Sequence, residues 1–266
     1  MDEDNHSVSR VLRIQLLGEL RLSDASGRAL PLPASKKTRA LLGYLIATGR
    51  PHQRERMCEL FWEEGPDDPR AALRWSLSKL RPLVDDANSP RLLTSRDQVA
   101  FEAREVEIDI VRIRALLASG IKHASLSALK TAAALFEGEL MEGLDLPTCY
   151  RFQAWCFAER NALTALRIEV LSALVERLRD QPLEALAYAR EWVNVDPLST
   201  AGHCALIRTL GALRGQNEAL KYYSYAVRAL ETQLGVPVEM ELHEAARALR
   251  SPTSTPQRER YFFSSG

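Results

Sequence analysis

Residues 67–84 read DDPRAALRWSLSKLRPLV, and this stretch decides the fold of the first hundred residues. Apolar side chains recur in it every three or four positions, which predicts an amphipathic helix with one buried face. The predicted buried stripe consists of Leu73, Leu77, Leu80 and Val84. Asp67 or Asp68 is the expected N-cap, and Pro69 suits the first turn, where its missing N–H is not needed.

Two shorter helices are predicted before this stretch. Ser35 is the expected N-cap of the first, whose apolar residues recur at helical spacing up to Gly49, a typical C-terminal stop. The second covers residues 53–62. Its inward side chains are predicted to be Met57, Leu60 and Phe61.

Short β-type runs flank the three helices. Residues 11–17, 20–22 and 29–32 predict a small antiparallel sheet at the N-terminus. After the third helix, residues 91–94 and 99–101 predict a hairpin with its turn between them. A winged helix-turn-helix has its elements in this order, with three helices followed by a hairpin. The additional sheet before the helices is typical of one subclass, the effector domains of response regulators.

Beyond about residue 106 the chain reads as successive helices. The predicted helices are 125–136, 150–179, 182–195, 200–214, 217–234 and 239–249. Glu184-Ala185-Leu186-x-Tyr188 recurs 34 residues later as Glu218-Ala219-Leu220-x-Tyr222, and this is the tetratricopeptide period. The predicted fold class is therefore an α+β winged helix-turn-helix followed by an all-α, tetratricopeptide-like helical-repeat domain.

The third helix carries a candidate DNA-reading surface outside its apolar stripe. Its members are Arg70, Arg74, Trp75, Ser78, Lys79 and Arg81, with small Ala71 between them. In a major groove Arg can bond guanine edges bidentately, Ser and Lys can reach phosphates, and an indole can pack on a sugar or a thymine methyl. The alternative is a solvated basic helix with Trp75 tucked under the hairpin. The third position in a winged-helix pattern favours the DNA-binding interpretation.

Other basic residues extend this surface. Lys36 and Lys37 begin the first helix, whose N-terminus can hold phosphate, although a solvated helix end explains them equally well. Arg91 and Arg96 belong to the predicted hairpin, and Arg96 at its turn is the better candidate for a wing contact to DNA. Residues 36–96 contain twelve Lys and Arg against eight Asp and Glu, a local positive excess that the whole chain hides.

The loop at residues 63–68 is acidic and would be repelled by phosphate. It is therefore expected either to face a protein, such as RNA polymerase, or to be a solvated capping loop.

Composition excludes several classes of protein. The chain has 266 residues with 35 Lys plus Arg and 35 Asp plus Glu, so it is not a uniformly basic, histone-like DNA binder. The sequence contains neither a membrane-length apolar run nor a secretory signal, which predicts a cytoplasmic protein.

The sequence also lacks phosphate-cradling glycine motifs, catalytic constellations and metal-ligand spacings, so we expect no enzyme activity, cofactor or metal. Cys149 and Cys156 are expected to be core thiols rather than a redox pair.

Several stretches resemble the antibiotic-regulatory-protein (SARP-type) activators. In the first half these are AALRWSLSKLR at 71–81, LFW at 60–62 and the acidic loop between them. The second half resembles the bacterial transcriptional activator domain (BTAD) of these proteins. The matching pieces are LFEGEL at 135–140, Trp155, Glu159-Arg160, DPL at 196–198, ALKYY at 219–223 and LExxLGVP at 230–237. Pro82, late in the third helix, departs from the pattern and is expected to shorten or kink that helix.

The resemblance implies a transcriptional activator that binds direct repeats in double-stranded DNA and recruits RNA polymerase holoenzyme with its sigma factor. It implies recognition by Arg74, Trp75, Ser78, Lys79 and Arg81, with Arg96 in the wing. The expected limits are a disordered 1–9, a winged helix at 10–106, the activator domain at 107–250 and a disordered tail at 251–266. A second copy of the chain, forming a homodimer on DNA, and an unidentified small-molecule effector are further possible partners.

The competing hypothesis is a different class of protein. It is a helical-repeat adaptor, or a regulator whose repeat domain senses a small molecule.

Overall fold

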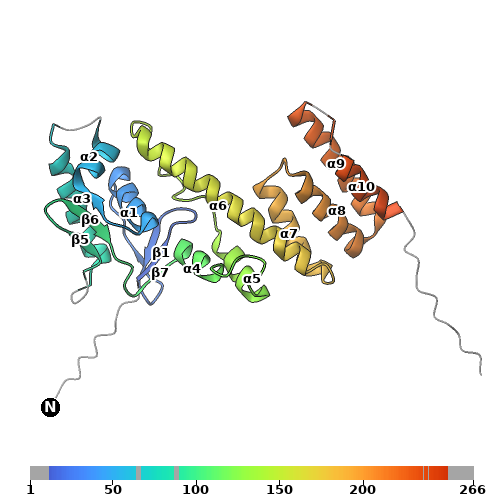
Figure 1. Ribbon diagram of the computed structural model, residues 1–266, viewed down its shortest axis with the longest axis horizontal. Coiled ribbons are helices and arrows are strands. Elements are labelled where there is room, and N and C mark those ends of the chain that lie inside the picture. The colour runs from blue at the N-terminus through green and yellow to red at the C-terminus, as the bar shows by residue number, and fades with distance from the viewer. Residues whose placement is uncertain (1–11, 64–66, 87–89, 236, 239, 251–266) are drawn as a thin grey trace, which may run out of the picture. The chain divides into compact units, whose positions relative to one another are not determined.

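A computed structural model describes residues 12–63, 67–86, 90–235, 237–238 and 240–250. Contacts divide the chain into two compact units, residues 1–173 and 174–266, which are described separately below. The long helix α6 (Tyr150–Arg177) crosses the division (Figure 1). The two segments that the sequence predicts to be disordered, 1–9 and 251–266, lie outside the described residues.

The first unit begins with a four-stranded sheet in the order β3-β2-β1-β7. The strands are β1 (Leu12–Gln15), β2 (Arg21–Ser23), β3 (Ala29–Leu30) and β7 (Val106–Ile108). The first three pair antiparallel, as predicted. The expectation of a purely antiparallel sheet is wrong, because β7 joins β1 in parallel with Ile14 opposite Ile108.

Three helices follow, close to their predicted limits: α1 (Lys36–Thr48), α2 (Arg54–Trp62) and α3 (Pro69–Val84). Ser35 caps α1, and Gly49 ends it in the left-handed conformation. The Asp68 carboxylate caps α3 by accepting a 2.8 Å hydrogen bond from the N–H of Ala71. Pro82 does not shorten α3, which continues to Val84.

The predicted hairpin is present and belongs to a second, three-stranded sheet. Its strands are β4 (His52–Gln53), β5 (Leu92–Thr94) and β6 (Gln98–Phe101), in the order β4-β6-β5. The sequence analysis did not identify β4, which is two residues long. Three helices with this hairpin packed against α3 form the predicted winged helix-turn-helix (Figure 1).

Two further helices complete the first unit before α6 begins: α4 (Asp109–Leu116), which was not predicted, and α5 (Leu126–Leu135). Asp109 fixes the start of α4, because its buried carboxylate accepts 2.7 Å hydrogen bonds from the N–H groups of Leu16, Leu17 and Ile110. Cys149 and Cys156 are buried and free, as predicted.

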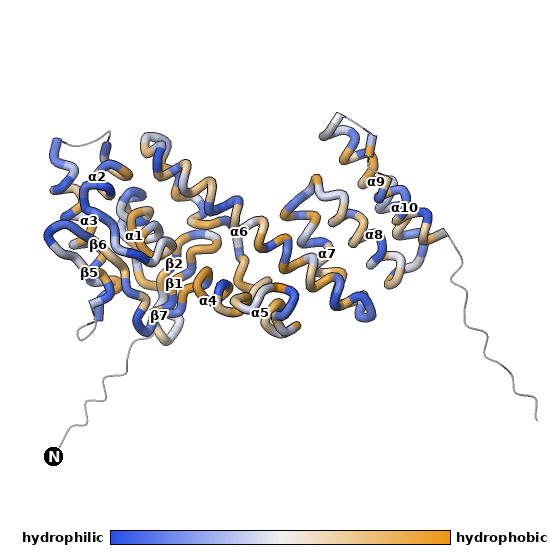
Figure 2. The backbone as a smooth tube through the Cα atoms, viewed as in Figure 1, coloured by the Kyte–Doolittle hydropathy of each residue, from blue (hydrophilic) through white to orange (hydrophobic). Residues whose placement is uncertain are grey.

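The second unit is a helical repeat. Its helices are α7 (Pro182–Val195), α8 (Thr200–Arg214), α9 (Gln216–Leu234) and α10 (Met240–Arg250). Helix α8 packs against the other three. Ala185 and Ala219, which occupy the same position in the 34-residue repeat, are both buried. Apolar and polar residues alternate along these helices (Figure 2), as expected when each helix buries one side.

Candidate nucleic-acid interface

Helix α3 is held in place by its predicted apolar stripe. Leu73, Leu80 and Val84 are fully buried, and Leu77 nearly so. A buried hydrogen bond of 3.0 Å between the hydroxyls of Thr38 and Ser76 also links α1 to α3. One side of α3 is thereby fixed against the rest of the winged helix.

The candidate DNA-reading residues all lie outside this buried stripe. Arg70, Arg74, Trp75, Ser78, Lys79 and Arg81 are exposed. The Trp75 side chain is 52% exposed, so the alternative that places it under the hairpin is wrong. Lys79 Nζ lies 5.7 Å from the centre of the Trp75 ring, and the Ser78 hydroxyl donates to the Trp75 carbonyl at 2.7 Å.

Two of the three arginines on α3 have carboxylate partners near its N-terminal end. Arg70 Nη2 lies 2.7 Å from a Glu55 oxygen on α2, and Arg74 Nη2 lies 3.5 Å from an Asp68 oxygen. All four side chains are more than half exposed, and exposed ion pairs contribute only about 0–1 kcal/mol each. A phosphate or a guanine edge can therefore replace either carboxylate at little cost.

Arg81 joins α3 to the hairpin. Its guanidinium donates to the Thr94 hydroxyl on β5 and lies 3.7 Å from an Asp85 oxygen. The predicted surface thus includes one arginine that also supports the wing.

Arg96 is exposed at the turn between β5 and β6, where the sequence predicts it. The turn is well anchored. The Ser95 hydroxyl accepts from the N–H of Gln98 at 3.0 Å, and the Asp97 carbonyl accepts from the N–H of Arg54 at 2.8 Å. Arg96 is consequently presented from a fixed loop.

Arg91, the second hairpin arginine, does not face outward. It is 2% exposed, its Nη1 donates to the Val84 carbonyl at 2.8 Å, and its Nε donates to the Arg104 carbonyl at 2.9 Å. The suggestion that Arg91 is a wing contact is therefore wrong. The sequence carries one clue to this, since Arg91 directly precedes the apolar pair Leu92-Leu93 of the strand.

The remaining candidates lie at helix ends. Lys36 is exposed and Lys37 half-buried in the first turn of α1, which fits both phosphate binding and a solvated helix end. In the acidic loop, residues 64–66 lie outside the described residues. Glu63 has a partner within the first unit, because Arg151 Nε lies 3.8 Å from its carboxylate.

Within the described ranges, no three His, Cys, Asp or Glu side chains are grouped so that they could hold a metal ion. The described helices likewise include none whose length and apolar character would allow it to cross a membrane.

Residues 102–250 match the family described as the bacterial transcriptional activator domain. The chain belongs to this family. Membership makes it a regulator of transcription, and it confirms the resemblance to SARP-type activators. A comparison with curated proteins gives no match.

A solved structure described as Mycobacterium tuberculosis EmbR in complex with low affinity phosphopeptide has a similar fold. The TM-score is 0.72 at 20% sequence identity, and the match covers 91% of this BTAD protein. It covers 65% of the EmbR chain, so this protein spans about two thirds of that relative's length. At this identity the likeness concerns the fold, a winged helix followed by helical repeats.

Proposed function

We propose that this BTAD protein is a sequence-specific activator that binds double-stranded DNA through α3 and recruits RNA polymerase holoenzyme. The observation that carries the proposal is the two-sided character of α3. One side is buried in the winged helix, and the other exposes Arg, Trp, Ser and Lys side chains that suit a DNA groove.

The exposed residues have distinct proposed roles. Arg74 reads a guanine edge, and Trp75 packs on a thymine methyl or a sugar. Ser78 and Lys79 bind phosphate, while Arg70 and Arg81 border the groove. Arg70 and Arg74 each exchange an exposed carboxylate for a DNA group when they bind.

Sites outside α3 supply backbone contacts. Arg96 on the wing reaches the adjacent backbone or minor groove. Lys36 and Lys37 bind phosphate beside the N-terminus of α1. Such contacts give affinity without sequence preference, and α3 gives the preference.

The rest of the proposal concerns assembly. The winged helix at 10–106 binds each direct repeat, and the activator domain at 107–250 mediates self-association on DNA or contact with the polymerase. The acidic loop at 63–68 is a second candidate for the polymerase contact. The protein acts in the cytoplasm and without catalysis.

A pull-down of fragmented host DNA tests the DNA-binding part. The comparison uses the wild-type protein, the double variant Arg74→Ala with Trp75→Ala, and the control Arg28→Ala. Arg28 is a matched control because it is exposed and pairs with Asp24 at 3.2 Å, as Arg74 pairs with Asp68, but lies in the loop between β2 and β3. We expect a few promoters with direct repeats to be enriched by the wild type and the control, and to be lost with the double variant.

Titrations on an enriched fragment then separate the two kinds of contact. Arg74→Ala should cost about 1–3 kcal/mol and relax base preference, whereas Lys79→Ala should weaken all sequences alike and reduce the salt slope by about one. Unchanged binding by the double variant would show that α3 is not the reading surface. If low salt gives no enrichment, the adaptor or small-molecule-dependent hypothesis is preferred.

A further inference from the structure

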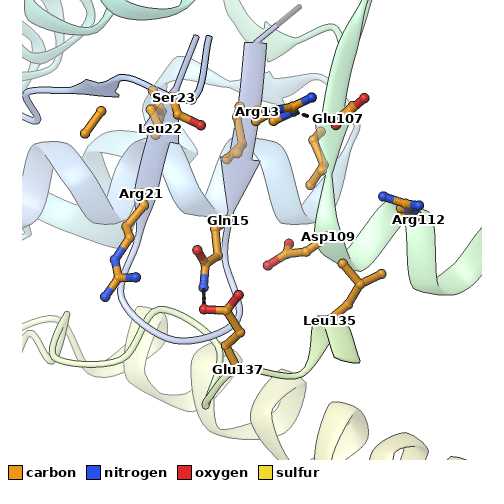
Figure 3. A pocket seen from close by; sticks show the side chains of 14 residues that line it. Arg13, Gln15, Arg21, Leu22, Ser23, Glu107, Asp109, Arg112, Leu135 and Glu137 are labelled. Carbon is orange, nitrogen blue, oxygen red and sulfur yellow. Dashed lines mark hydrogen bonds and ion pairs between the residues drawn. The ribbon is translucent and has the colours of Figure 1, made fainter. Parts of the chain in front are cut away.

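A groove of about 520 Å³ lies over the outer face of the N-terminal sheet, within the first unit (Figure 3). Strand alternation places Arg13 and Gln15 of β1 and Arg21 of β2 on this face, while Leu12, Ile14 and Leu22 point into the core. Helix α4 contributes Arg112, α5 contributes its last residue, Leu135, and the segment after α5 contributes Glu137. The volume is that of a small-molecule site.

The carboxylates of the groove are already engaged by the protein. Glu107 lies 2.9 Å from Arg13 Nε, and Glu137 accepts a 2.7 Å hydrogen bond from the Gln15 amide. Asp109 accepts its three backbone hydrogen bonds at the start of α4. All three carboxylates therefore have partners in the protein, but of the three Glu107 alone is paired with a cation, and Glu137 and Asp109 are bonded to neutral donors.

Two guanidiniums remain available to a ligand. Arg112 is exposed, and its side chain makes no hydrogen bond or ion pair within the described part of the chain. Arg21 forms an exposed ion pair with Glu19 at 3.6 Å, which a ligand can replace at little cost, and Glu19 does not line the groove. Figure 3 shows Arg21 and Arg112 on opposite sides of Gln15 and Asp109. The groove therefore presents positive charge at two separate places.

We infer that this groove binds a small molecule with an acidic group at each end, one on Arg21 and the other on Arg112. Guanidinium binds carboxylate and phosphate through paired N–H donors, so either kind of acid fits. The Gln15 amide nitrogen already donates to Leu17 and Glu137, so its oxygen, together with the exposed Arg13–Glu107 pair, offers polar contacts to the middle of such a molecule, and Leu135 offers an apolar one. This inference does not rest on the proposed DNA binding.

Isothermal titration calorimetry on the full chain at constant ionic strength tests the inference. The probes are 1,6-hexanediol bisphosphate and adipate, each with two acidic ends, against inorganic phosphate and hexanoate, each with one. We expect at least one two-ended probe to bind at least tenfold more tightly than its one-ended counterpart. The preferred probe distinguishes a phosphate ester from a dicarboxylate.

The variants Arg21→Ala and Arg112→Ala locate the binding. Each should weaken the two-ended probe at least tenfold and reduce it to the affinity of the one-ended probe. Arg28→Ala is the control, because Arg28 lies between the groove residues Gly27 and Ala29 but does not line the groove. Circular dichroism confirms that the variants fold. Equal affinity for one-ended and two-ended probes would mean that each acidic group binds as an adventitious ion only. Wild-type affinity in both groove variants would place the binding site elsewhere. Either result overturns the inference.

Discussion

Replacing Arg91 with Met is expected to destabilise the winged helix, whereas the same change at Arg96 should leave its stability almost unaltered. Both arginines lie on the hairpin, but Arg91 is 2% exposed and Arg96 is on the surface. Arg91 Nη1 donates to the Val84 carbonyl in the last turn of α3, where carbonyls have no partner within the helix. Its Nε donates to the Arg104 carbonyl, beyond β6. One guanidinium thus connects the end of α3 with both ends of the hairpin.

The size of the effect follows from these two bonds. A hydrogen bond to a charged donor contributes about 1.5–3 kcal/mol, so losing both would cost about 3–6 kcal/mol. Methionine fills most of the same space and removes the desolvation cost of a buried charge, which offsets part of the loss. We therefore expect a net destabilisation of about 2–4 kcal/mol.

Urea unfolding followed by tryptophan fluorescence measures the effect, since Trp62, Trp75 and Trp155 all lie in the first unit. Arg96→Met is the matched control and should change stability by less than about 0.5 kcal/mol, while it weakens DNA binding. The reasoning is refuted if Arg91→Met unfolds like the wild type. It is also refuted if that variant loses DNA affinity at unchanged stability, because Arg91 would then act in the interface.

Three further predictions concern the first unit. Burial lowers the pKa of His52 below its usual value of 6.5; stability should therefore fall as the pH drops below about 6.5, and His52→Gln should flatten that decline in melting temperatures measured from pH 8 to 5. Gly43→Ala should lower the melting temperature, because the new Cβ would clash with the fully buried Met141 side chain. Overpacking of this kind costs about 1–3 kcal/mol, which exceeds or matches the roughly 1 kcal/mol that alanine gains in helix propensity. An unchanged melting temperature would show that the core adapts to the added methyl group. Asp109→Ala leaves three backbone N–H groups without their acceptor and should cost about 2–4 kcal/mol; hydrogen exchange should accelerate at those amides and not at the end of α1.

Local signals were sufficient to predict most helices. Helix α1 lies between the side-chain cap Ser35 and the left-handed Gly49, and α3 starts at Asp68-Pro69, so their limits are written in adjacent residues. The limits of α7 and α8 match the prediction for the same reason: Pro182 and Ser199 mark their starts.

The missed elements depend on distant partners. Strand β7 has three residues, and what makes it a strand is pairing with β1, more than ninety positions earlier. Strand β4 is formed by His52 and Gln53 opposite Val99 and Gln98. A run of two or three residues carries no periodicity of its own, and neither β4 nor β7 is joined to its partner strand by a short turn, which is the signal available for β2, β3 and β5.

The candidate site was predictable in composition but not in arrangement. Helical spacing separates the exposed residues of α3 from its buried stripe, and the structure keeps that separation. The partner of Arg70 was not predictable, because Glu55 lies fifteen residues earlier on another helix. The burial of Arg91 likewise depends on how the hairpin packs against the end of α3.

The charged residues of the proposed interface fall into two groups with different physical consequences. Arg70 and Arg74 are held by carboxylates in the free protein, so they gain less electrostatic energy on meeting DNA but lose less side-chain freedom. Lys36, Lys79 and Arg96 form no ion pair within the described ranges, so their charge is fully available to attract phosphate from a distance. Residues that must match a base edge benefit from being oriented beforehand, whereas residues that bind the uniform backbone do not need it. The division therefore matches the proposed roles, in which the paired Arg74 reads a base edge and the unpaired cations supply affinity.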